Sequence, residues 1–231
     1  MHSAICALIS AYALSGAQPG ESVGYLWFYK PDAAGKVCKA SEPYVPREGD
    51  IVFFDDMSKF WEFLYWIGHT KPPFHTGIVI KKPDGTLALL ESGPDDTLYV
   101  YILDVEPRLH EFKGEIQVRR CKRELTPEQS KVLTSFAMAQ EGKRYAMWRL
   151  LLQGTPCKTR GGPLRDHLAK TRFDSDRWLC TEIVVTAAEL VGLMDPKVIK
   201  GTNTYPIDIL DDHKFELLPV YEEAGYWCRH P

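Results

Sequence analysis

Short apolar runs bounded by turn residues dominate the first half of the chain, a pattern typical of β-strands. REGDIVFFDD (Arg47–Asp56) predicts a turn followed by a short strand. FHTGIVIKKPDGTLALLES predicts a hairpin, with strands over His75–Lys81 and Leu87–Glu91 joined by a PDG turn. Two more strands are expected in TLYVYILDV and EIQVRRC. The preceding residues 18–48 are rich in Gly, Pro and small polar residues and are expected to be irregular.

Helical patterns dominate the second half. LTPEQSKVLTSFAMAQEGKRY has Thr126 as N-cap, Pro127 at the first helical position and Gln129 to complete a capping box. A shorter helix is expected around Ala146–Leu152. In WLCTEIVV, Cys180 stands in the first turn of a helix that Gly192 ends.

Two other segments give weaker patterns. MSKFWEFLYWIGHTKPP is rich in aromatic residues and helical in character as far as Ile67. One more strand is expected near Phe215–Val220, and the preceding NTYPIDILDD (Asn203–Asp212) is expected to be structural. Strands followed by helices, rather than alternating βαβ units, predict an α+β fold with an antiparallel sheet packed against helices.

The chain has 231 residues, which suits one well-cored domain. Its net charge is −3, and basic residues stand beside acidic ones, so nucleic-acid binding is not expected. The apolar run Ala4–Leu14 predicts either a signal peptide over 1–17, cleaved before Gln18, or a first helix. A single catalytic domain is expected over 18–231. With a leader the protein would be exported to the periplasm or cell envelope, and otherwise it would be cytoplasmic.

The cysteines show no C-x-x-C pair, so neither a zinc site nor another metal or cofactor is expected. Without the leader, and with Cys180 as a nucleophile, four remain and would permit disulfides in an oxidising compartment. These four are Cys38, Cys121, Cys157 and Cys228.

Cys180 is the candidate nucleophile because a helix N-terminus stabilises a thiolate. A thiol nucleophile needs an imidazole as base and a third polar group that orients the ring. His75 opens one strand of the predicted hairpin and Glu91 closes the other, which makes them the candidate base and orienting carboxylate. Gly77 leaves room for a close approach beside them.

These motifs resemble a known family. GDIVFF and HTGIVI are similar to the second half of the NlpC-like papain-fold cysteine peptidases. FAMAQEGKRYA and LCTEIVVTAAELVGL are similar to their first half. The reversed order is the mark of the circularly permuted, YiiX-like branch, and the resemblance spans Arg47 to Leu193.

The resemblance implies a papain-like fold with a catalytic triad. Cys180 would be the nucleophile, His75 the general base and Glu91 the orienting residue, where non-permuted members carry a second His or an amide. Tyr145 falls on the family's tyrosine near the active site, a candidate for holding the oxyanion or the substrate.

The expected function is that of an amidase or peptidase acting on peptide-like or N-acyl substrates. One alternative is a thioesterase, lipase or acyltransferase, favoured by the aromatic segment with Trp61 and Trp66. That segment would form a pocket wall, a helix resting on a membrane or cell-envelope surface, or a cap on the sheet. The other alternative is a non-catalytic lipid- or cell-wall-binding module on the same fold.

Overall fold

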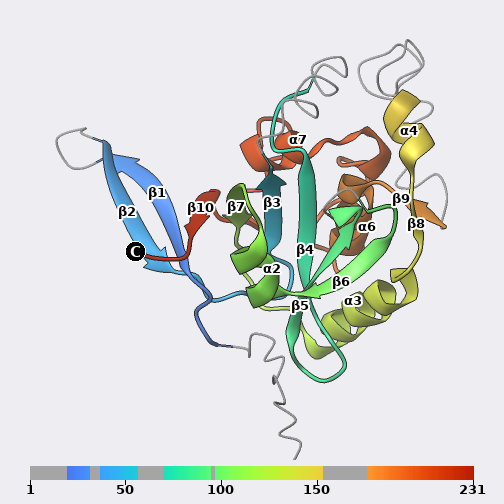
Figure 1. The fold of residues 1–231 in the computed structure, drawn as a ribbon, viewed down its shortest axis with the longest axis horizontal. Helices are drawn as coiled ribbons and strands as arrows, with labels where there is room; N and C mark the ends of the chain where they lie inside the picture. Colours follow the sequence, from blue (N-terminus) through green and yellow to red (C-terminus); the bar gives the residue numbers. More distant parts are fainter. Residues whose placement is uncertain (1–19, 32–36, 57–69, 95–96, 153–175) are drawn as a thin grey trace, which may run out of the picture.

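The computed structural model describes residues 20–31, 37–56, 70–94, 97–152 and 176–231 (Figure 1). These residues form an antiparallel sheet of eight strands in the order β2-β1-β10-β7-β3-β4-β5-β6. The strands are β1 (Tyr25–Pro31), β2 (Val37–Pro43), β3 (Ile51–Asp55), β4 (His75–Lys81), β5 (Leu87–Ser92), β6 (Val100–Asp104), β7 (Glu115–Arg119) and β10 (Gly225–Cys228). The predicted α+β class, with an antiparallel sheet packed against helices, is confirmed.

Helices and a small second sheet complete the described structure. The helices are α2 (Val105–Glu111), α3 (Pro127–Gln140), α4 (Met147–Leu152), α6 (Cys180–Leu190), the 3-10 helix η2 (Gly201–Asn203) and α7 (Pro206–Asp211). The short strands β8 (Arg144–Tyr145) and β9 (Arg177–Trp178) pair in parallel beside them.

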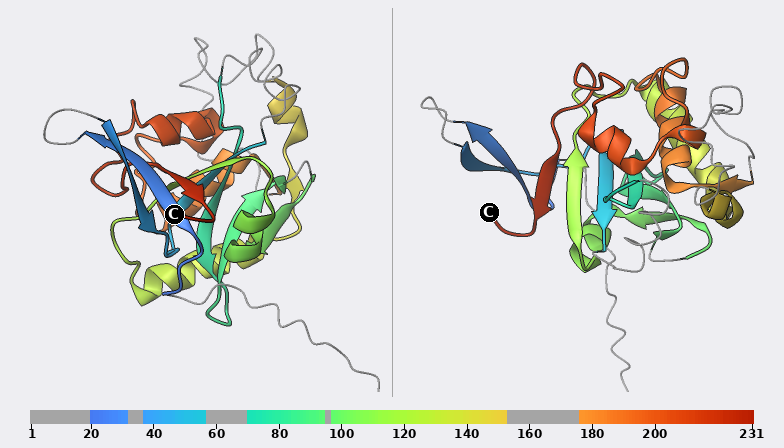
Figure 2. Two further views of the ribbon diagram at one scale, coloured as in Figure 1. Left: turned by 60° about the vertical axis from the view of Figure 1, so that its left-hand side comes forward. Right: turned by 90° about the horizontal axis from the view of Figure 1, so that it is seen from above.

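The central strands β4 and β5 are buried on both faces, which explains their continuous apolar runs. Because successive side chains of a strand point to opposite faces, Ile78 and Leu90 belong to one core cluster, with residues of α3 and α6. Val79 and Leu89 belong to another, with residues of α2. Views from two further sides show the sheet between these helices (Figure 2). The site described below depends on this division into two faces.

The helix over Pro127–Gln140 begins where its capping residues predict. The Thr126 hydroxyl accepts the backbone N–H of Gln129 at 3.2 Å, and the Gln129 side chain accepts the N–H of Thr126 at 2.9 Å. The predicted hairpin of β4 and β5, the strands β6 and β7 and the helices α4 and α6 are also confirmed. Helix α2 follows β6 directly and was not predicted.

The prediction for residues 18–48 is wrong, because β1 and β2 form a hairpin there that projects from the sheet (Figure 1). β1 pairs with β10, with Tyr25 opposite Cys228. The partner strand lies about 200 residues away along the chain. The local composition of 18–48 therefore carries no sign of the pairing.

The strand expected near Phe215–Val220 is also absent from the described structure, where these residues form turns. Asp212 has a left-handed φ of 50°, and its carboxylate accepts the N–H groups of Leu217 and Leu218. These local hydrogen bonds close a loop in place of a sheet ladder.

Two predictions concern residues outside the described ranges, namely the leader over 1–17 and the aromatic segment up to Ile67. Among the described residues, no helix is long and apolar enough to cross a membrane.

The buried carboxylate of Asp50 connects the segment before β3 with the end of β7. Asp50 accepts the hydroxyl of Tyr44 at 3.1 Å and the backbone N–H groups of Arg47 and Cys121 at 2.9 and 2.7 Å. Burial raises the pKa of Asp50 to about 7, although these hydrogen bonds favour the charged form.

We expect Asp50→Ala to lower the free energy of unfolding by about 3 kcal/mol, because two buried donors lose their acceptor. The folded pKa of Asp50 lies above its ordinary 3.8, so its stabilising contribution is present at acid pH and is lost as pH rises through about 7. The difference between the variant and the native chain should therefore be larger at about pH 5 than at about pH 8. Urea unfolding at both pH values measures it. Asp84→Ala, at an exposed turn, is the control, and an equal loss there would contradict the role of Asp50.

Candidate active site

Cys180 is the first residue of α6, and its side chain is 5% exposed. The Glu182 carboxylate accepts the backbone N–H of Leu179 at 3.3 Å and pairs with Arg149 at 2.8 Å, which secures the first turn. The first N–H groups of a helix have no acceptor within it, and the dipole is positive there. The thiol therefore lies where a negative charge on sulfur is stabilised.

His75 and Glu91 are brought together by the register of the hairpin. Glu91 lies directly opposite Gly77, and His75 is two residues from Gly77 on the same face of β4. The Glu91 side chain crosses Gly77 diagonally, and its Oε2 lies 2.7 Å from Nε2 of His75. A Cβ added at Gly77 would lie 2.7 Å from Cγ of Glu91, so only glycine leaves this path open.

Cys180 and His75 meet at the end of β4, although α6 packs on the face of the sheet opposite to the one that carries the His75 and Glu91 side chains. Helix α6 packs on the face opposite Glu91, and its N-terminus reaches the start of β4. There Sγ of Cys180 lies 3.9 Å from the carbonyl oxygen of Phe74, the residue before His75, so the thiol and the imidazole are neighbours. Because Glu91 takes Nε2, Nδ1 is the nitrogen left for the sulfur.

The three groups shift one another's pKa values. Burial alone would lower the pKa of His75, but its hydrogen bonds to Cys180 and Glu91 and their negative charges raise it to about 9. Burial alone would raise the pKa of Cys180, but the interaction with His75 lowers it below the ordinary value. The pair therefore favours a thiolate beside an imidazolium.

Arg108 of α2 adds a cation that the sequence did not reveal. Its Nε and a terminal nitrogen bind the two oxygens of Glu91 at 2.9 and 3.0 Å. Burial raises the pKa of Glu91, but His75 and Arg108 together bring it below the ordinary value. The signal that could have found it is an arginine four residues after the end of β6, the strand that pairs with Glu91.

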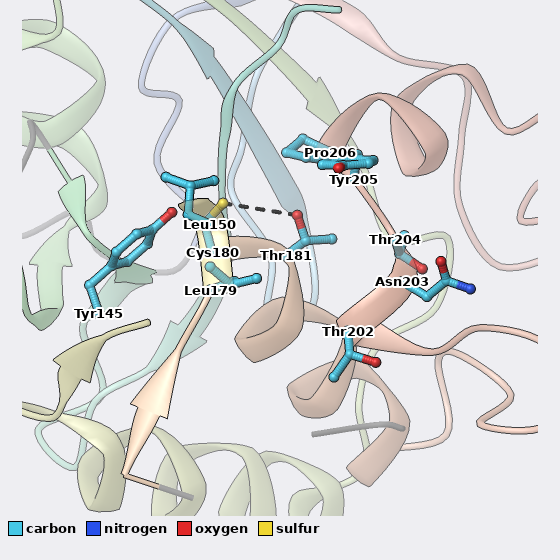
Figure 3. A pocket seen from close by; sticks show the side chains of 10 residues that line it. All are labelled: Tyr145, Leu150, Leu179, Cys180, Thr181, Thr202, Asn203, Thr204, Tyr205 and Pro206. Atoms are coloured by element: carbon cyan, nitrogen blue, oxygen red, sulfur yellow. Dashed lines mark hydrogen bonds between the residues drawn. The ribbon is translucent and has the colours of Figure 1, made fainter. Parts of the chain in front are cut away.

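A pocket opens beside the thiol, with about 410 Å³ of empty space that is partly open to solvent. In Figure 3 the ring of Tyr145 points its hydroxyl toward the sulfur of Cys180. The pocket is lined by Tyr145, Leu150, Leu179, Cys180, Thr181, Thr202, Asn203, Thr204, Tyr205 and Pro206. NTYPIDILDD was expected to be only structural, but its first residues form one wall of this pocket.

Two predictions remain, the tryptophans of the aromatic segment and the cysteines that could form disulfides. Trp61 and Trp66 lie outside the described residues. Cys121 and Cys228 are free thiols, so neither forms a disulfide, and burial raises the pKa of Cys121. Among the described residues, no three His, Cys, Asp or Glu side chains are grouped to hold a metal ion.

No protein-family model matches the chain, and no curated protein matches it. Among solved structures it is similar to the crystal structure of metalloprotein YiiX from Escherichia coli O157:H7, with 20% identity and a TM-score of 0.43. The match covers 63% of this chain and 66% of that one. The YiiX-like branch and the NlpC-type permutation both stay predictions.

We expect Gly77→Ala to displace Glu91 from His75, since the added methyl group occupies the path of the carboxylate side chain. The backbone of Gly77 needs no left-handed conformation, and the added Cβ would lie 3.2 Å from the backbone oxygen of Leu90, a tight contact that needs only a small shift. Labelling of Cys180 by iodoacetamide near neutral pH should fall about tenfold, while the far-ultraviolet spectrum is retained. Labelling at the native rate would show that Glu91 finds another way to His75.

Proposed function

We propose that the protein is a cysteine hydrolase that cleaves an amide or acyl bond through a thioester intermediate. The observation that carries the proposal is the arrangement of three residues: Cys180 lines a pocket, His75 lies beside it, and Glu91 lies 2.7 Å from the His75 ring. A nucleophile, a base and an orienting carboxylate in this order are what acyl transfer by a thiol requires.

In the proposed reaction, His75 holds the proton of the thiol and the sulfur of Cys180 attacks the carbonyl carbon of the substrate. The tetrahedral oxyanion lies near the backbone N–H of Cys180, with the Tyr145 hydroxyl as a second donor. His75 then gives its proton to the leaving amine or alcohol, and the thioester remains. Water attacks the thioester, His75 takes a proton from it, and the carboxylic acid is released as the thiol is restored.

Glu91 supports each proton transfer. Its carboxylate accepts the N–H at Nε2, which fixes the ring orientation and stabilises the imidazolium between the two proton transfers. The raised pKa of His75 and the lowered pKa of Cys180 imply that the reactive ion pair forms at a lower pH than an ordinary thiolate does and is lost as pH rises through about 9.

The pocket supports amide and N-acyl substrates. Its nine described lining residues other than Cys180 are uncharged, and they combine apolar walls with hydroxyl and amide groups. A neutral acyl or peptidyl group fits such walls. Leu150, Leu179 and Pro206 also favour an apolar acyl chain, so fatty-acyl esters and thioesters are the second substrate class to test.

We expect iodoacetamide to modify Cys180 before Cys121 and Cys228, because its thiolate is stabilised and the pKa of Cys121 is raised. His75→Ala should slow this labelling about tenfold near pH 7, where an ordinary thiol is only a few per cent ionised. Peptide mapping by mass spectrometry measures the rate at each cysteine. If Cys228 or Cys121 reacts first and His75→Ala changes nothing, the proposal fails.

We expect Tyr145→Phe to lower kcat about a hundredfold if its hydroxyl donates to the oxyanion, while labelling of Cys180 keeps its native rate. The measurement is hydrolysis of a panel of peptidyl amides and of acyl esters of increasing chain length. Efficiency that rises with chain length favours the acyl substrates, and efficiency independent of it favours the peptidyl amides. Replacing Trp61 and Trp66 by alanine tests whether the aromatic segment contributes to that dependence. Slower labelling in Tyr145→Phe would assign the tyrosine to the thiol instead.

A further inference from the structure

The carboxylate of Glu91 is completely buried, and its two oxygens are shared between two cations. Oε1 accepts from Nε of Arg108 at 2.9 Å. Oε2 accepts from the terminal nitrogen of Arg108 at 3.0 Å and lies 2.7 Å from Nε2 of His75. This two-point binding fixes the plane of the carboxylate and leaves Oε2 directed at the imidazole.

Arg108 is itself held in place. Its side chain is 6% exposed, and the guanidinium lies 4.6 Å from the ring centre of Phe54 and 5.3 Å from that of Phe112. Phe54 also packs against the His75 ring, at 5.8 Å between centroids. Helix α2 therefore delivers a cation that is oriented by aromatic contacts on the same side of the sheet as the histidine.

We propose that Arg108 is a positioning residue that keeps Glu91 charged and correctly oriented, and so acts on the thiol through Glu91 and His75 without touching the substrate. This inference rests on the proposed function. It adds a fourth member, from a helix outside the sequence motifs, to the series that ends at Cys180.

The charged and titratable groups around Glu91 determine the direction of the effect. His75 faces it from β4 and Arg108 from α2, Tyr101 lies opposite it on β6, and Cys180 lies beyond His75 on α6. Burial disfavours the carboxylate, and the two cations oppose that cost. Without Arg108, Glu91 should take up a proton at a higher pH. A neutral Glu91 no longer stabilises the imidazolium, and the thiolate then loses its partner.

The direction in which the pH profile moves follows from the protonation of Glu91. As pH falls, Glu91 takes up a proton, the imidazolium loses its partner, and the thiolate of Cys180 becomes protonated. Raising the pKa of Glu91 therefore moves the acid limb of thiol labelling to higher pH. A guanidinium that only filled space or neutralised charge for stability would change the melting temperature and leave this limb in place.

The experiment is the pH profile of iodoacetamide labelling at Cys180 in the full chain, for Arg108→Met and Arg108→Lys. Arg119→Met and Arg119→Lys are matched controls. Arg119 is 1% exposed and bonds the backbone oxygens of Ile209 and Glu222 at 2.7 and 3.0 Å, so it is an equally buried arginine outside the triad.

We expect the acid limb to move up by about one pH unit or more in Arg108→Met, and to stay in place in both Arg119 variants. Lysine keeps the charge but not the two-point geometry. In Arg108→Lys the acid limb should therefore lie close to its native position, while the plateau rate stays about tenfold below the native one. An acid limb that does not move in Arg108→Met overturns the proposal. Where Arg108→Met does not fold, a native plateau rate in Arg108→Lys overturns it, and a loss absent from Arg119→Lys supports it.

Labelling of the His75→Ala variant separates the test of Arg108 from the test of the proposed function. If His75→Ala leaves labelling of Cys180 unchanged, the proposed function fails and the inference fails with it. If His75→Ala slows labelling but Arg108→Met leaves the acid limb in place, only the role of Arg108 is wrong.

Discussion

A carboxylate buried without solvent must be balanced by cations, and Glu91 is such a group at the centre of this structure. Arg108 and His75 provide the balance, and each comes from a different element, α2 and β4. The same constraint requires glycine at position 77, because the carboxylate side chain reaches His75 across that residue. The contact between the thiol and the imidazole depends in turn on the orientation that Glu91 gives the ring.

The two-faced sheet explains how groups on opposite sides can act together. Glu91 and Arg108 lie on the face covered by α2, while α6 packs on the other. His75 is the first residue of β4, at the end of the strand, where its ring can contact both sides. A histidine deeper in the strand would be separated from Cys180 by the backbone of the sheet. The site therefore lies at the end of the sheet where β4 and α6 begin.

The pocket adds the segment that follows α6. Residues of η2 and the start of α7 stand beside the thiol, opposite Tyr145 and Leu150. The chain turns back to the nucleophile because α6 ends after three turns and the following residues pack against its first half. Apart from the nucleophile, a neutral lining of this kind selects substrates by shape and hydrogen bonding rather than by charge.

The elements that could be predicted from the sequence are those whose signals are local. The capping residues of α3, the turn between β4 and β5 and the cysteine at the start of α6 each depend on neighbours within a few positions. The candidates Cys180, His75 and Glu91 followed from these elements and a family resemblance. The pairing of β1 with β10, the place of Arg108 and the pocket wall of η2 and α7 could be seen only in the folded chain. Each of these joins segments far apart in the chain, and such contacts are set by packing and burial of the whole fold, which no local pattern records.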